Sequence, residues 1–105
     1  MDKDHIEEIF QSLGPVTIRR MFGGQGIYHM GKILALVVHG ELLFKADKES
    51  APAFAEAGSR QWEYESKTGK PAFMPYWSIP EEAYDDPDEM ARWVRLAYEA
   101  SVRAK

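Results

Sequence analysis

The sequence of 105 residues contains no cysteine, and none of its hydrophobic runs is long. The absence of cysteine excludes a disulfide scaffold, a thiol nucleophile, a thiolate zinc site and an iron–sulfur cluster. The longest apolar run, residues 33–38, is too short to span a bilayer as a helix. The first five residues are polar and acidic and show no signal-peptide pattern. We therefore expect a cytoplasmic protein with no membrane contact.

Basic residues are also too few for a protein that works mainly by neutralising phosphates. Lysine and arginine number 13 against 17 aspartates and glutamates, a net charge of −4, whereas such proteins are usually basic. Residues 81–89 hold six of the carboxylates, and Arg92, Arg95 and Arg103 follow them. Acid before base favours one helix whose charges match its dipole. The alternative interpretation is an acidic docking patch.

The remaining composition is that of an ordinary globular protein, with 45% hydrophobic, 29% charged and 12% aromatic residues. This composition argues against disorder, and a chain of this size buries about two thirds of its surface on folding. We find no internal repeat, low-complexity tract or linker in the sequence. We therefore expect one domain that spans residues 1–105.

Two short helices are expected in the first half of the chain. Apolar side chains recur with helical spacing in residues 4–13, where Asp4 is the expected N-cap and a Gly-Pro pair ends the helix. Residues 51–57 form the second helix, which begins after a cap at Asp47 or Ser50.

A third helix follows the acidic segment. Asp86 is the expected N-cap, Pro87 occupies the first helical position and Glu89 the third. The stripe that faces the core is expected to contain Met90, Trp93, Val94, Ala97, Tyr98 and Ser101.

The segments between the helices have the patterns of strands, separated by glycine-containing turns. Pro75 cannot donate to a strand ladder, so its strand should lie at an edge or carry a bulge there. The order predicts an α+β class in two layers: one antiparallel sheet of about five strands with helices on one face, in the order α-β-β-β-α-β-β-α. The candidate segments before the second helix are residues 16–21, 26–30, 33–38 and 42–45, which form three or four strands, and those after it are residues 61–67 and 72–79.

No motif in the sequence indicates catalysis. The cluster Gly23, Gly24 and Gly26 is followed by neither the Lys-Ser/Thr of a phosphate-binding loop nor the helix of a dinucleotide site. We interpret it as a turn or bulge. The three histidines share no ligand spacing, and no serine lies in a nucleophile motif. We expect no catalytic residue, no metal and no cofactor.

Two groups of residues have the types that form interfaces. Arg19 and Arg20 lie beside Phe22 and close to Tyr28, a mixture of cations and aromatics typical of single-strand binding. In a strand the two arginines point to opposite faces, so only one joins a given patch. The second group places large apolar residues on both faces of one strand, and one of these faces needs a cover. It consists of Phe73, Met74, Tyr76 and Trp77, with Trp62 and Tyr64 nearby.

Several blocks of the sequence resemble the TfoX N-terminal domain family. They are residues 19–28, residues 34–37 with 42–47, residues 74–80, and the closing helix with Trp93 and Ala97. Together they cover nearly the whole chain in the family's order. The resemblance implies a secretion-chaperone-like two-layer fold. It also implies kinship with bacterial regulators of competence genes, which act as co-activators alongside the cyclic-AMP receptor protein and not as enzymes.

We therefore expect a non-catalytic protein-interaction domain of the transcriptional co-regulator type. The expected partner is a component of the transcription machinery or a second copy of the chain, as a homodimer, without direct contact to nucleic acid. The candidate surface consists of Arg19, Arg20, Phe22, Gly23, Gly24, Gly26, Tyr28, Met74, Tyr76 and Trp77.

Two alternatives remain open. One is a module that binds nucleic acid directly through Arg19, Arg20, Lys45, Lys67 and Lys70. A steep loss of affinity with rising salt would identify it. The other is a small-ligand pocket lined by Tyr28, Trp62 and Tyr64, which requires a concave site at those residues.

Overall fold

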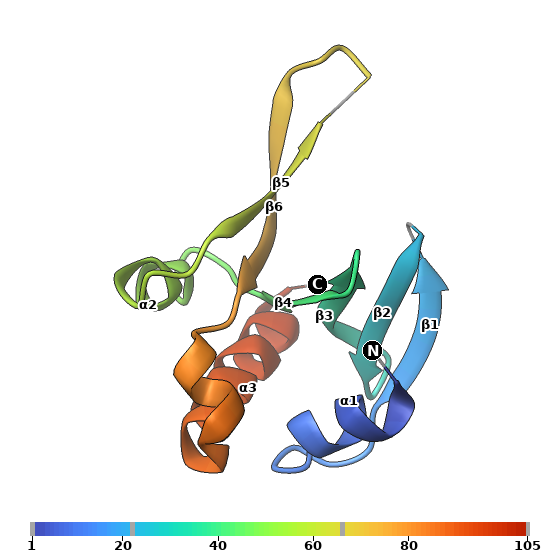
Figure 1. Cartoon of the computed structure of the whole chain (residues 1–105), viewed down its shortest axis with the longest axis vertical. Helices are drawn as coiled ribbons and strands as arrows, with labels where there is room; N and C mark the ends of the chain where they lie inside the picture. The colour runs from blue at the N-terminus through green and yellow to red at the C-terminus, as the bar shows by residue number, and fades with distance from the viewer. Residues whose placement is uncertain (1, 22, 66, 105) are drawn as a thin grey trace.

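The computed structural model describes residues 2–21, 23–65 and 67–104 and shows one antiparallel sheet in the strand order β1-β2-β3-β4-β6-β5 (Figure 1). The α+β class and the order of helices and strands are confirmed, with six strands instead of about five, because four strands precede the second helix. The elements are α1 (Lys3–Ile9), β1 (Thr17–Met21), β2 (Gly24–His29), β3 (Lys32–Val38), β4 (Glu41–Lys45), α2 (Ala51–Glu56), β5 (Gln61–Glu65), β6 (Pro71–Ser78), the 3-10 helix η1 (Glu81–Asp85) and α3 (Pro87–Arg103).

Tight turns connect the strands of the β2-β3-β4 meander. Met30 and Gly31 join β2 to β3, and His39 and Gly40 join β3 to β4. All four residues have positive φ, between 50° and 82°. Such two-residue turns match the twist of a hairpin, and they confirm both hairpins expected from the glycines.

The helices bury their apolar faces against one side of the sheet. Asp86 caps α3, because its carboxylate accepts hydrogen bonds from the amides of Asp88 and Glu89, as expected. From α3, Trp93 reaches Phe54 of α2, with ring centroids 4.8 Å apart. The expected inner stripe is wrong at one position. Tyr98 is 37% exposed, and the smaller Ala100 is buried next to Ser101.

The first helix begins earlier than the sequence indicates. Asp2, not Asp4, is its N-cap, and its carboxylate accepts a hydrogen bond of 2.8 Å from the amide of His5. Both aspartates satisfy the preference for an N-cap, and the aspartate three residues before His5 is the one that reaches a free amide. The helix contributes Ile6 and Ile9 to the core.

Pro75 marks a bulge inside the sheet. β6 lies between β4 and β5, so Pro75 is not on an edge strand. The register with β5 changes from Gln61 opposite Trp77 to Glu63 opposite Phe73, so β6 carries extra residues at this point. The carbonyl of Pro75 still accepts a 3.0 Å hydrogen bond from the amide of Ala46. The bulge, one of the two expected outcomes, is confirmed.

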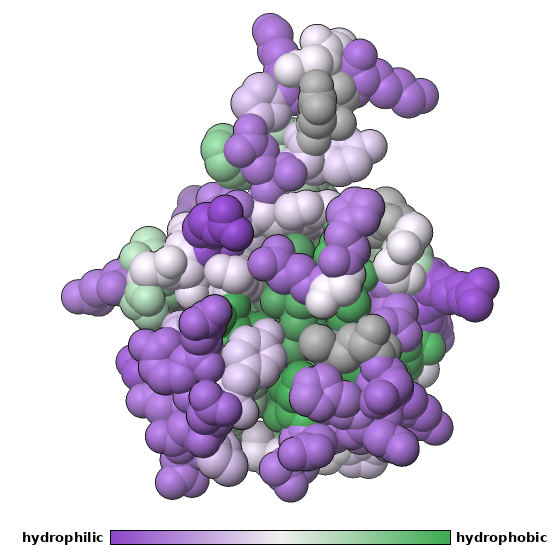
Figure 2. Space-filling model, in the orientation of Figure 1, coloured by the Kyte–Doolittle hydropathy of each residue, from purple (hydrophilic) through white to green (hydrophobic). Residues whose placement is uncertain are grey.

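Beyond this bulge, β5 and the first half of β6 form an arm that projects from the body (Figure 1). β4 pairs with three residues of β6, from Tyr76 to Ser78, so within the described residues the outer half of β6 pairs with β5 alone. Figure 2 shows the arm standing clear of the rest, with hydrophilic side chains near its tip. Among the described helices, none is long and apolar enough to cross a membrane.

Candidate functional site: the open face of the sheet

Apolar side chains form two separate clusters, one on each face of the sheet. The first contains residues from α1, α2 and α3 and is the main core. The second contains residues from strands alone. We call the side that carries the second cluster the open face. Its buried members are Leu36, Val38, Leu43 and Tyr76, and its partly buried members are Met21, Ile33, Trp62 and Met74.

One end of the open face is organised around a glycine. The guanidinium carbon of Arg19 lies 5.2 Å from the centre of the Tyr28 ring, a cation–π contact. The Tyr28 hydroxyl lies 3.6 Å from the sulfur of Met21. Both side chains fold over Gly26, where an added Cβ would collide with the Met21 sulfur. Gly26 therefore lets Tyr28 and Met21 close over the sheet, and Arg19 lies against the Tyr28 ring on this face.

Tyr76 closes the other side of the same cluster. It lies opposite Lys45 in the sheet register and is 7% exposed. Burial raises the pKa of the Tyr76 phenol, and repulsion from the Tyr28 phenol raises it further. Burial lowers the pKa of Lys45, the Asp47 carboxylate opposes that change, and Lys32 reinforces it. Between the strands of the two tyrosines lie β3 and β4, whose Leu36 and Leu43 are each 2% exposed in the same cluster as Tyr76.

The structure brings about half of the candidate residues together. Arg19, Gly26, Tyr28, Met74 and Tyr76 belong to the open face. Phe22 lies outside the described residues.

Other candidate residues lie elsewhere. Arg20 points to the opposite side of β1 from Arg19, as its neighbouring position in a strand requires. Trp77 lies on the helix side, where its ring stacks on Phe54 at 6.3 Å. Gly23 and Gly24 lie at the β1–β2 turn.

The glycines of this turn have structural roles. Gly23 adopts a φ of +72°, which favours glycine. A Cβ at Gly24 would collide with the backbone carbonyl of Val37. The expected turn is therefore present at Gly23, and Gly24 permits a close approach of backbones. Beside it lies an open hollow of about 650 Å³, lined by Arg20, Met21, Gly23, Gly24, Gln25, Val37, His39 and Gly40.

The residues of the two alternative functions do not gather at one place. Lys67 and Lys70 lie in the turn at the tip of the arm, away from Arg19. Tyr28 is in β2, whereas Trp62 and Tyr64 contact each other in β5, with ring centroids 6.2 Å apart. The hollow at Trp62 is lined also by Glu41, Leu43, Arg60, Gln61, Glu63 and Ser78, without the two tyrosines. No group of three metal-ligating side chains occurs in the described part of the chain.

The cations of α3 and those of the strands differ in their ion pairs. On α3, Arg92 pairs with Glu89 at 3.7 Å, and Arg95 pairs with Glu99 at 3.4 Å. The strand cations differ: among the ion pairs of the described residues, none involves Arg19, Arg20, Lys32 or Lys45. The chain is acidic overall, yet these strand cations take part in none of the ion pairs formed by the described residues.

Sequence reasoning missed the centre of the open face. Leu36, Val38 and Leu43 are buried there, and Lys45 lies beside them. The continuous apolar run of residues 33–38 was the available signal, because a strand that is apolar at every position is covered on both faces. The residues of β3 on one face pack against the helices, so those on the other face belong to a second apolar cluster.

Comparison with known proteins gives one result. The family model for the TfoX N-terminal domain matches residues 8–101, nearly the whole chain. No curated protein matches the sequence.

Proposed function

The chain belongs to the TfoX N-terminal domain family, and we propose that it is a non-catalytic regulatory domain that acts by binding a protein partner through the open face. The family is associated with competence regulation. The proposed role is that of a transcriptional co-regulator, exerted through contact with another protein and without chemistry on a small substrate.

The open face is the observation that supports this proposal. It carries apolar and aromatic side chains without a helix from the described residues above them, and Arg19 stands at its border. Tyrosine, tryptophan, methionine and arginine are the residue types enriched at the centres of protein interfaces. The surface is a broad sheet with side chains projecting from it, a shape suited to a protein partner.

Site-specific photo-crosslinking tests this proposal. A photoreactive phenylalanine analogue at Met74 places the probe on the open face, and the same analogue at Tyr84 of η1 is the control on the helix side. Tyr84 is 44% exposed and Met74 is partly buried, so neither probe replaces a fully buried side chain. In cells that naturally carry the gene, we expect one discrete protein adduct from position 74 and none from position 84. Equal adducts from both positions, or none from 74, would refute the proposal.

A functional readout accompanies the crosslink. Replacing Met74 by glutamate puts a charge on the open face without removing a fully buried side chain. If the partner belongs to the transcription machinery, this variant changes the transcript levels of DNA-uptake genes as deletion of the gene does. A Tyr84→Glu control leaves them as in the wild type.

A further inference from the structure

β1 is an edge strand whose sequence favours one kind of neighbour. It is the first strand in the sheet order and pairs with β2 alone among the described residues. Its outer backbone N–H and C=O groups are therefore available to an added strand. We propose that β1 binds an extended acidic segment of the protein partner, which joins the sheet beside it. This inference rests on the proposed function and names the chemistry of the partner.

The two arginines of β1 are the first argument. Arg19 lies on the open face, above Tyr28, and Arg20 points to the other side because successive strand residues alternate. Both are exposed, and neither takes part in an ion pair with a described residue. A ligand confined to one face reaches only one of them. A chain that runs along the edge reaches both, since its own side chains alternate in the same way.

The neighbours of the arginines extend this pattern. Ile18 packs against the main core, and Met21 packs against the open-face cluster. The order along β1 is therefore apolar, basic, basic, apolar. Directly opposed side chains interact most strongly between strands, so the complementary segment is apolar, acidic, acidic, apolar. This order reads the same in both directions, and the expectation holds for either strand orientation.

Charge also decides against a second β1 as the occupant. Two copies of β1 paired in an antiparallel arrangement around their centre would place arginine opposite arginine, and like charges in that position destabilise a sheet. Charged edges prevent such self-pairing. The same charges attract carboxylates. At the opposite edge of the sheet, β5 carries Glu63, so an acidic segment is repelled there, and β5 serves as an internal control.

A peptide titration followed by NMR tests the inference. The probe is acetyl-Thr-Val-Glu-Glu-Val-Thr-amide, and its control has glutamines in place of both glutamates. With the full chain labelled with ¹⁵N, we expect shifts in β1 and slower hydrogen exchange at every second β1 amide, those that point away from β2. An Arg19→Gln/Arg20→Gln variant should weaken binding about 10-fold, because each exposed ion pair contributes a factor of about 2 to 5. The glutamine peptide should lose a similar factor.

A charge exchange separates loss of binding from loss of folding. Arg19→Glu/Arg20→Glu should bind a peptide with two lysines better than the original peptide, and an unfolded protein would bind neither selectively. An Arg92→Gln/Arg95→Gln variant on α3 is the matched control and should bind the original peptide as the wild type does. Shifts confined to β5, or equal affinity for the glutamate and glutamine peptides, would overturn the inference.

Other occupants of this edge would also be recognised. If a short oligothymidylate shifts the β1 signals more strongly than the peptide does, the occupant of this edge is a nucleic acid and the inference is overturned. If the protein self-associates and both Arg19 and Glu63 are required, the occupant is β5 of another copy and the inference is likewise overturned. If crosslinking at Met74 succeeds while the β1 variants and the peptide have no effect, the inference fails and the proposed function stands. If the peptide binds and crosslinking fails, the proposed function is the part that fails.

Discussion

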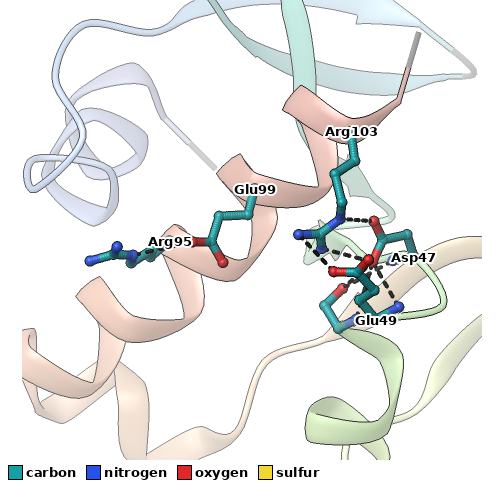
Figure 3. Close-up of polar contacts among 6 residues, drawn as sticks. Asp47, Glu49, Arg95, Glu99 and Arg103 are labelled. Atoms are coloured by element: carbon teal, nitrogen blue, oxygen red, sulfur yellow. Dashed lines mark hydrogen bonds and ion pairs between the residues drawn. The ribbon is translucent and has the colours of Figure 1, made fainter.

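Arg103 forms a bidentate ion pair with Asp47, which joins the last turn of α3 to the loop after β4 (Figure 3). Its Nε donates to Oδ2 of Asp47 at 2.6 Å and its Nη2 donates to Oδ1 at 2.9 Å. A third nitrogen, Nη1, lies 3.2 Å from a carboxylate oxygen of Glu49. The Asp47 carboxylate also accepts hydrogen bonds from the amides of Glu49 and Ser50, each 3.1 Å long. One carboxylate thus organises both the approach to α2 and the end of α3.

The first prediction concerns the pH dependence of stability. The hydrogen bonds from Arg103, followed by those from Ser50, hold the pKa of Asp47 well below its ordinary value. A lowered carboxyl pKa contributes stability that is present above the pKa of the unfolded chain, about 3.9. This contribution is lost as pH falls through the folded pKa. Urea unfolding from pH 7 to pH 2 should therefore show a gap between the wild type and Asp47→Asn that is constant above about pH 5 and narrows below about pH 4.

At neutral pH, Asp47→Ala should lower the free energy of unfolding by about 1 kcal/mol through the lost bonds to the amides before α2. Glu49→Ala is the matched control, because Glu49 lies at the same arginine and holds no amide in place. A gap between the wild type and Asp47→Asn that widens on acidification would contradict the role of the Asp47 carboxylate.

The second prediction separates two neighbouring glycines. A Cβ at Gly24 meets the backbone of Val37, which cannot move without disturbing the sheet, whereas a Cβ at Gly26 meets the end of the flexible Met21 side chain. Gly24→Ala should therefore destabilise the fold by about 2 to 3 kcal/mol, and Gly26→Ala by less than about 1 kcal/mol. Thermal unfolding of both variants measures the difference. Equal losses of stability in the two variants would mean that the Met21 side chain cannot move aside any more easily than the Val37 backbone.

The third prediction separates two residues of β6. Trp77 stacks on Phe54 in the main core, and Met74 lies on the open face beyond the pairing with β4. Trp77→Ala should cost about 2 to 4 kcal/mol of stability, and Met74→Ala less than about 1 kcal/mol. Urea unfolding followed by circular dichroism gives both values. A small loss at Trp77 would contradict its place in the core and return it to the candidate surface.

Features that depend on a few adjacent residues could be predicted from the sequence alone. The cap at Asp86, the turns at Gly31 and Gly40 and the bulge at Pro75 each depend on a few adjacent residues, and all were predictable. The first cap was not predicted correctly, because Asp4 was expected and only the folded geometry shows that Asp2 reaches the amide of His5.

Long-range features were not predictable. Arg103 and Asp47 lie 56 positions apart, and no local pattern pairs them. The same holds for the candidate surface. Tyr76 and Trp77 were both assigned to it from the sequence, although neighbouring strand residues lie on opposite faces of the sheet. Residue types indicated an interface, but the sheet order decides that Tyr28 and Tyr76 close over one cluster.

The last prediction concerns the arm. Its outer half is a two-stranded ribbon, and Phe73 and Tyr64 are 63% and 53% exposed there. Two strands without a covering layer are marginally stable, so the arm should open locally far more often than β3 and β4, whose central side chains are buried on both faces. Hydrogen exchange of the amides of Ala72, Phe73 and Met74 should be faster than that of Leu36 and Leu43 by at least about 30-fold. Repeating the measurement at tenfold lower protein concentration, with light scattering on the same samples, distinguishes the isolated arm from an associated one. Slow exchange that disappears on dilution would mean that a second copy covers the arm, and slow exchange at every concentration would contradict the marginal stability of the ribbon.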